Sequence, residues 1–410
     1  MSRFTFYEFF AGGGMARAGL GESWHCLFAN DFDQMKVETY EANWGTGDIR
    51  HKDVASLTLS DLPARAVDLV WASFPCQDLS LAGSYHGLGR ERDKVATRSG
   101  TFWPFWKLMR GLTKDGRAPR AIVLENVYGC LTSREGKDFA SIASALADLD
   151  YRFGAAVVDA VHFVPQSRPR VFFIAFRGDQ WIPTSLIAEG PQESWHPAAI
   201  IEAYAGIDTA GKRNWIWWSM LRPLARNSTF ADLIEDAPTA VKWHAAAHTT
   251  YILNLMSPLN RKKVSDAIRT GLRVVGAVYR RTRPDDNGIK RQRAEVRFDD
   301  VAGCLRTPAG DSSRQVILVI EGKTVRSRLL SPRGFGIAID RWGSSTRRPL
   351  YINLLARGTV APGRVARCQS HQNGVVCFVF VASGKELLSR FRCPTQVWAV
   401  FMGKDSWFES

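Results

Sequence analysis

The sequence predicts an α/β protein whose first 180 residues form a doubly wound parallel sheet. Two observations support this fold class. Apolar runs of strand length alternate with helix-length stretches from residue 5 to residue 176. In addition, the first apolar run leads into the glycine turn Ala11-Gly12-Gly13-Gly14 and then a short helix. A strand, a glycine turn and a helix in this order open the nucleotide site of a doubly wound sheet.

Residues 5–10 are the first expected strand, and the glycines after it let the backbone approach a ligand closely. About 20 residues further on, a second strand at residues 26–29 leads to Asp31, an offset that suits a ribose diol. An expected helix at residues 32–43 precedes Asp48, whose carboxylate could accept from an adenine amino group. Asp48 could equally be a plain turn former, and three glycines are often only a turn.

The strand expected at residues 68–72 places a cysteine at the edge of the sheet. Pro75 ends this strand because proline cannot donate to a ladder. Cys76 therefore follows the carboxyl end of a buried strand, where open α/β sheets place their chemistry. A thiol there can act as a nucleophile if its pKa is lowered, and the alternative is a buried structural cysteine.

The next elements direct more polar groups to the same edge. Residues 81–100 show no periodicity, as is typical of a lid or binding loop. A helix at residues 101–112 and a strand at residues 120–124 lead to Glu125, whose carboxylate would face the same cleft as Cys76. After a helix at 137–148 and a strand at 154–159, Arg168 and Arg170 precede the strand at 171–176. Two arginines two positions apart can clamp an anion or a carbonyl, or lie on a solvated edge.

The α/β alternation fades after residue 177, and residues 178–300 are rich in Trp, Pro and basic groups. Residues 261–293 contain eleven Lys or Arg and three Asp. Basic groups with interleaved aromatic residues suit a phosphate-binding face, and a solvated basic surface is the alternative. The net charge of +14 also indicates a polyanionic partner, with nucleic acid as the first choice and an acidic membrane surface as the second.

The whole chain of 410 residues is long enough for one large domain or two, and we expect two. Its hydrophobic content of 45% argues against global disorder. No apolar run of membrane-spanning length and no signal-peptide core are present, so we expect no membrane segment. The seven cysteines form no CxxC pair and no metal-ligand spacing, which predicts free thiols in a reducing cytoplasm and no metal site.

Taken in order, six motifs resemble the DNA (cytosine-5) methyltransferase family of bacterial or phage type. The resemblance covers residues 4–177 and resumes at residues 304–332. The motifs are Phe9-Phe10-Ala11-Gly12-Gly13-Gly14, Asn30-Asp31, Gly47-Asp48-Ile49, Phe74-Pro75-Cys76-Gln77, Glu125-Asn126-Val127 and Gln166-Ser167-Arg168-Pro169-Arg170.

The resemblance implies a Rossmann-like, S-adenosylmethionine-dependent methyltransferase sheet with a smaller, mixed target-recognition domain. Cys76 would attack carbon 6 of a cytosine flipped out of duplex DNA, and S-adenosyl-L-methionine would methylate carbon 5. Glu125 would hold the ring's nitrogen 3 and amino group. Arg168 and Arg170 would bind the carbonyl and could help to lower the pKa of Cys76.

The resemblance also implies binding residues. Asp31 would take the ribose and Asp48 the adenine. The expected cofactor-binding residues are Phe10, Ala11, Gly12, Gly14, Asp31, Phe32, Asp48, Ile49, Phe74 and Pro75. The expected DNA-binding residues are Gln77, Ser80, Arg98, Arg280, Arg281 and Arg283. Residues 81–100 would be the lid over the flipped base.

The family pattern divides the chain into a catalytic and cofactor-binding domain (1–180), a target-recognition region (181–300), a return to the catalytic domain (301–333) and an atypical C-terminal segment (334–410). Two departures are mild: Ser73 replaces the usual Gly, and Asp31 replaces the commoner Glu. The third is larger, because no Gly-Asn-x-Val segment follows residue 333. Either the pocket is completed differently, or the tail is out of frame, in which case we expect it to be poorly packed.

We therefore expect a monomer that acts on double-stranded DNA in a bacterial cytoplasm, associated with the nucleoid. A cognate restriction endonuclease, which would make it part of a restriction-modification system, and the recognised DNA sequence stay open. An RNA cytosine-5 methyltransferase and a catalytically silent DNA-binding homologue are the alternatives. A cysteine hydrolase would need a histidine base near Cys76, and no motif supplies one.

Overall fold

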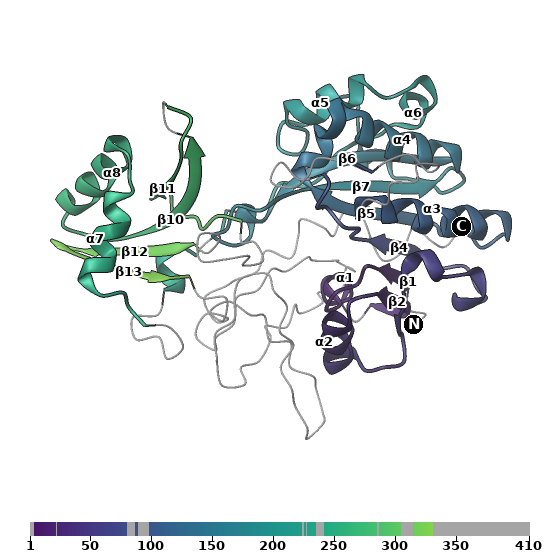
Figure 1. Cartoon of the computed structure of the whole chain (residues 1–410). Coiled ribbons are helices and arrows are strands. Elements are labelled where there is room, and N and C mark those ends of the chain that lie inside the picture. Colours follow the sequence, from purple (N-terminus) through teal and green to yellow (C-terminus); the bar gives the residue numbers. More distant parts are fainter. Residues whose placement is uncertain are drawn as a thin grey trace.

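The computed structural model describes residues 4–21, 23–79, 87–88, 98–223, 225–226, 228–234, 242–284, 287–304 and 315–330. Within these residues, the chain forms a large sheet with helices on both faces and, apart from it, a smaller antiparallel sheet (Figure 1). Ser80, most of the expected lid and the whole C-terminal segment 334–410 lie outside the described residues.

The large sheet has seven strands in the order β3-β2-β1-β4-β5-β7-β6. The first five strands of the chain are parallel, and β7 runs antiparallel between β5 and β6. The predicted doubly wound α/β fold class is therefore confirmed. The strands are β1 (Phe4–Phe9), β2 (Trp24–Asp31), β3 (Ile49–His51), β4 (Leu69–Ala72), β5 (Ala121–Val127), β6 (Tyr151–Asp159) and β7 (Pro169–Arg177).

Helices cover both faces of this sheet because alternate strand residues are apolar on each side. One face packs against α3 and α4, through residues such as Phe105 and Phe139. The other packs against α1 and α2, through residues such as Ala16 and Tyr40. These helices are α1 (Met15–Leu20), α2 (Gln34–Trp44), α3 (Phe102–Lys114) and α4 (Lys137–Asp148).

The segment after β7 packs on the β6 edge of the large sheet, although the sequence places it in the recognition region. The Ile216 N–H donates to the Phe153 carbonyl at 2.6 Å. A Cβ at Gly154 would lie 1.9 Å from the Ile216 carbonyl, so this close approach requires glycine. Burial of its apolar residues holds the segment there. Its elements are β8 (Ile187–Ala188), α5 (Ala198–Ala205), α6 (Thr209–Asn214) and β9 (Trp217–Trp218).

The second sheet is antiparallel, with the order β11-β10-β12-β13. Helices α7 and α8 pack on one of its faces. The strands β12 and β13 pair here rather than returning to the catalytic sheet as expected, since their apolar residues complete this smaller core. The elements are α7 (Ala246–Asn254), α8 (Pro258–Arg269), β10 (Arg273–Pro284), β11 (Lys290–Arg297), β12 (Val316–Glu321) and β13 (Thr324–Leu329).

Among the helices of the described residues, none is both long enough and apolar enough to cross a lipid bilayer.

Candidate active site

Three neighbouring strands of the large sheet bring the predicted catalytic residues together. Cys76 follows β4, Glu125 lies near the end of β5, and Arg170 begins β7 opposite Val127. The Arg170 Nε lies 3.0 Å from the Glu125 Oε1, and both side chains are largely buried. The antiparallel β7 starts where the parallel β4 and β5 end, which is why residues far apart in sequence share this edge.

The Cys76 thiol is half-buried, and its surroundings act on its pKa in opposite directions. Burial raises the pKa of Cys76, and the charge of Glu125 adds to the rise. Arg170 and Arg168 lower it, as the sequence predicts, but they do not reverse the effect of burial. With its pKa raised above the ordinary value for a thiol, Cys76 is mainly a neutral thiol at neutral pH.

Arg168 is positioned by its backbone and by its side chain. Its N–H donates to the Asp159 carboxylate, and its Nη1 lies 3.7 Å from the Cys304 Sγ as a donor. Burial and the nearby charge of Arg170 lower the pKa of the Arg168 guanidinium, which nevertheless remains charged. The sulfur of a thiol is a weak acceptor, so Arg168 keeps a positive charge that no carboxylate neutralises through a bond to its guanidinium among the described residues.

The root of the expected lid is fixed by a reciprocal pair of hydrogen bonds. The Ser99 N–H donates to the Asp78 Oδ2 at 2.9 Å, and the Asp78 N–H donates to the Ser99 Oγ at 3.2 Å. Asp78 and Ser99 are both buried. Gln77 and Arg98, the two predicted DNA contacts next to this pair, are exposed. Their side chains therefore remain accessible to a ligand above the sheet edge.

The predicted cofactor residues form a turn that is held from below by two acids. The Gly12 N–H donates to the Asp31 Oδ2 at 2.9 Å. Glu8, an acid inside the apolar first strand, accepts from the N–H groups of Ala16 and Arg17 at 2.9 and 3.3 Å. Burial raises the pKa of Glu8 to about 8. Phe10, Gly12 and Gly14 all have positive φ, so this backbone is sharply folded.

The surface beside this turn is open and includes an exposed aromatic ring. A Cβ added at Gly12 would meet no atom within 4 Å, so the turn is open on this side. The ring of Phe32 is 62% exposed next to Asp31, which leaves an aromatic face available. By contrast, Gly14 packs against Trp44, while Ala11 and Ile49 belong to the core beneath.

The carboxylate of Asp48 already forms an ion pair within the protein. Its Oδ2 lies 2.8 Å from the Arg17 Nη1, which also donates to the Tyr40 hydroxyl. The guanidinium lies over the Trp44 ring, 4.9 Å from its centroid. Phe74 is buried, and its carbonyl accepts from the Asn126 Nδ2 at 3.1 Å, which links the strand ends of β4 and β5. Pro75 is half-buried beside it.

Two of the predicted arginines of the second sheet, Arg280 and Arg281, lie on opposite faces of it. In the β10–β11 hairpin, Arg281 lies opposite Arg293 and Arg283 opposite Arg291. Side chains alternate along a strand, so residue 280 belongs to the face of Val278, which packs on the helices. The other face carries Ala277 and Tyr279 and joins Ala302 in a separate cluster. The structure thus places Arg280 and Arg281 on opposite faces of the sheet.

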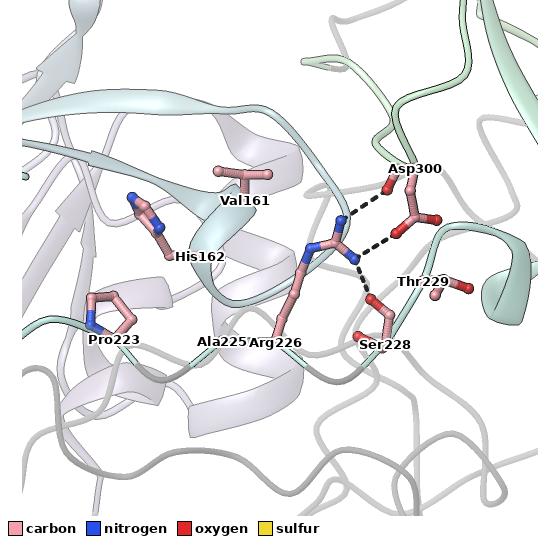
Figure 2. A pocket seen from close by; sticks show the side chains of 8 residues that line it. All are labelled: Val161, His162, Pro223, Ala225, Arg226, Ser228, Thr229 and Asp300. Atoms are coloured by element: carbon pink, nitrogen blue, oxygen red, sulfur yellow. Dashed lines mark hydrogen bonds and ion pairs between the residues drawn. The ribbon is translucent and has the colours of Figure 1, made fainter.

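A pocket of about 550 Å³ lies near the connection between the two sheets and does not include Cys76, Glu125 or Arg170. It is lined by Val161, His162, Pro223, Ala225, Arg226, Ser228, Thr229 and Asp300. Figure 2 shows Arg226 reaching both Asp300 and the Ser228 carbonyl across one side of it. Arg226 thus connects the segment that leads into the second sheet with Asp300, in the segment that follows β11.

Several residues that support the site are not singled out by the sequence motifs. Glu8 could have been noticed as an acid inside an apolar strand. Asp159 and Cys304 have no local signal, because they reach Arg168 only through the fold. Arg17 likewise meets Asp48 from another element.

Comparison with known proteins agrees with the geometry. A family model described as C-5 cytosine-specific DNA methylase matches residues 4–331. The Type II methyltransferase M.BsuFI of Bacillus subtilis is 32% identical over 203 residues, which are 49% of this chain and 46% of that protein. The DNA-cytosine methyltransferase of Escherichia coli (strain K12) is 31% identical over 205 residues, covering 43% of this chain and 43% of that protein. The match thus spans less than half the length of either relative.

Among solved structures, the S. pombe Dnmt2 methyltransferase covers 47% of this chain and 57% of that chain. Its sequence identity to this chain is 21% and the TM-score is 0.37.

Proposed function

Because this chain belongs to the C-5 cytosine-specific DNA methylase family, we propose that it methylates carbon 5 of cytosine in double-stranded DNA. The observation that supports this most directly is the convergence of Cys76, Glu125, Arg168 and Arg170 at one edge of the sheet. The direct test is methyl incorporation into duplex DNA and into transfer RNA, followed by bisulfite sequencing of the DNA. Transfer to RNA alone would favour the alternative substrate.

In the proposed reaction, the Cys76 sulfur bonds to carbon 6 of a cytosine that has left the duplex stack. This addition makes carbon 5 a nucleophile. Glu125 contacts the ring's nitrogen 3 and amino group, and Arg168 contacts the ring carbonyl, so charge that develops on the ring is stabilised. Once carbon 5 has taken the methyl group, loss of its proton to a base expels the Cys76 thiolate and restores the ring, which is now methylated.

The glycine turn and its surroundings fit S-adenosyl-L-methionine. When bound, this cofactor supplies the methyl group. Gly12, Phe10 and Gly14 would hold its methionine end, since the backbone is sharply folded and open beside Gly12. Asp31 would accept from the ribose, Phe32 would cover one face of the adenine and Asp48 would accept from its amino group. Arg17 would then share the Asp48 carboxylate with the adenine.

Replacement of Phe32 by alanine should weaken cofactor binding without loss of stability. Stacking of a base on an aromatic ring contributes about 1–3 kcal/mol, so affinity should fall roughly fivefold to hundredfold. Because the Phe32 side chain is mostly exposed, the unfolding temperature should hardly change. Calorimetry with S-adenosylhomocysteine measures the affinity.

The matched control for this variant is Met35→Ala, which removes a 58% exposed apolar side chain from the nearby helix α2. It should leave the affinity unchanged. Equal losses in both variants would remove Phe32 from the cofactor site.

The face of the second sheet that carries Tyr279 and Arg281 is the proposed DNA face. It clusters with Ala302, whose carbonyl accepts from the Ser167 N–H next to Arg168, so it is continuous with the active site. Arg281 and Arg293 are exposed and directly opposite each other. The Arg281 Nε lies 3.2 Å from the Glu295 Oε2 on the same face, so these three residues carry a net positive charge that a polyanion would neutralise. At the other end of this face, Arg326 lies 4.6 Å over the Trp243 ring.

Replacement of Arg281 and Arg293 together by alanine should weaken the salt dependence of DNA binding. Each phosphate contact contributes a slope of about 0.9 in the logarithmic plot, so the slope should fall by roughly 1 to 2. Titration of labelled duplex at several salt concentrations measures it. Arg280→Ala is the control, because its side chain belongs to the other face of the strand, and its slope should match the wild type. A loss of slope in Arg280→Ala alone would reverse the assignment of the faces.

A DNA substrate would place the protein with the nucleoid in a bacterial cytoplasm. A monomeric state and a cognate restriction endonuclease remain predictions of the same proposal.

A further inference from the structure

Gln315, a buried glutamine directly before β12, hydrogen-bonds to the segment that leads back toward the active site. The Gln315 Oε1 accepts from the Gly303 N–H at 3.2 Å, and its Nε2 donates to the carbonyls of Gly303 and Cys304 at 3.1 and 3.3 Å. The Gly303 carbonyl also accepts from the Nε2 of Gln166 at 3.3 Å. Both glutamines are at most 5% exposed. Two buried side-chain amides that hydrogen-bond to one short segment restrict its position closely.

This segment is bound directly to the motif that contains Arg168. The Ala302 N–H donates to the Pro165 carbonyl at 2.9 Å, and the Ser167 N–H donates to the Ala302 carbonyl at 2.8 Å. Beyond these bonds, the Cys304 Sγ accepts from the Arg168 Nη1. The backbone before Arg168 and the end of its side chain are therefore both held by residues 302–304.

The same segment is also packed tightly against the second sheet. A Cβ at Gly303 would lie 1.9 Å from the Tyr279 hydroxyl oxygen, so a larger residue would displace the Tyr279 ring of β10. Two residues before this segment, the Asp300 carboxylate accepts from Arg226 and from the Phe230 N–H. Figure 2 shows the Asp300 contact with Arg226. A shift of β10 would therefore be transmitted to Gly303 rather than absorbed by a gap.

We infer that residues 302–304 are a positioning element that couples the second sheet to Arg168, and that Gln315 is the positioning residue that holds it. The inference rests on the proposed function, since Arg168 is there a contact of the cytosine ring. Gln315 touches neither the cytosine nor the cofactor in this scheme. Its loss would leave the Gly303 N–H and the Cys304 carbonyl without this buried partner, so the segment and the Arg168 side chain would move.

The test compares Gln315→Met, which keeps the length of the side chain and removes its three hydrogen bonds, with Gln192→Met, which changes an exposed glutamine. Single-turnover methyl transfer should fall roughly tenfold to hundredfold in Gln315→Met, the size expected of a misplaced contact group. The dissociation constants for duplex DNA and for S-adenosylhomocysteine should stay within about twofold. Gln192→Met should match the wild type in all three.

Two further variants keep the test decisive if Gln315→Met fails to fold. Cys304→Ala removes only the sulfur that faces Arg168 and should also slow transfer at unchanged DNA affinity. Gln315→Glu keeps the acceptor for the Gly303 N–H but directs a buried carboxylate oxygen at the carbonyls of Gly303 and Cys304, so it should lose at least as much rate as Gln315→Met. An unchanged rate in Cys304→Ala, or a rate loss matched by an equal loss of DNA affinity, overturns the inference. If the wild type transfers no methyl group to DNA, the proposed function itself fails.

Discussion

Replacement of Cys76 by serine should abolish methyl transfer to duplex DNA. A serine hydroxyl ionises far less readily than a thiol at neutral pH, so the attack on carbon 6 loses its nucleophile. DNA affinity should remain within about twofold, because the basic hairpin of the second sheet is unchanged. Transfer above a few per cent of the wild-type rate would remove Cys76 from the nucleophile role.

A covalent assay gives an independent measurement of the same step. Duplex DNA that contains 5-fluorocytosine cannot lose a proton from carbon 5, so a protein–DNA adduct should accumulate with the wild type and survive denaturing electrophoresis. Cys76→Ser should give no adduct.

The rate should also depend on pH with a definite sign. Burial raises the pKa of Cys76, so the thiolate fraction is small at neutral pH and grows as pH rises. Single-turnover transfer should therefore increase between about pH 6 and pH 8. A rate that falls over this range would contradict attack by an ionised Cys76.

Replacement of Glu125 by glutamine should slow methyl transfer by about a hundredfold or more, the size expected of a positioned acid. The glutamine keeps the shape of the side chain and can still accept from Arg170. The charge of Glu125 raises the pKa of Cys76, so its removal should lower that pKa and, by itself, favour the thiolate. A loss of rate in this variant therefore cannot be attributed to a less ionised Cys76.

The control is Glu193→Gln, which changes an exposed acid of the segment after β7 and should leave the rate unchanged. Cofactor affinity, measured by calorimetry, should be the same in both variants. If Glu125→Gln lost only cofactor affinity, Glu125 would belong to the other pocket.

The sequence alone was sufficient for the α/β class and for placing Cys76 and Glu125 at one edge of the sheet. Both follow from local patterns. An apolar run followed by Pro75 specifies where a strand ends, and the carboxyl ends of parallel strands share one edge of a sheet. The glycine turn and Asp31 are local in the same sense, and the structure joins them through the Gly12 N–H.

The second sheet could not be predicted from its sequence to the same degree. Its hairpin is dominated by basic residues, so the apolar alternation that marks a half-buried strand is weak along β11. Without that strand assignment, Arg280, Arg281 and Arg283 appear as one cluster. The observed register places Arg280 and Arg281 on opposite faces, because successive residues of a strand point to opposite sides of the sheet.

The contacts that tune the site were decided only by the tertiary structure. Arg170 forms an ion pair with Glu125, and Arg168 donates to the Cys304 sulfur. Gln315 hydrogen-bonds to Gly303. The members of these pairs are between 12 and 136 residues apart in the chain. No local pattern specifies such pairs, since they depend on strand order and on how the returning chain crosses between the two sheets. The sequence determined which chemical groups reach the edge of the sheet, and the long-range packing determined which of them hold one another in place.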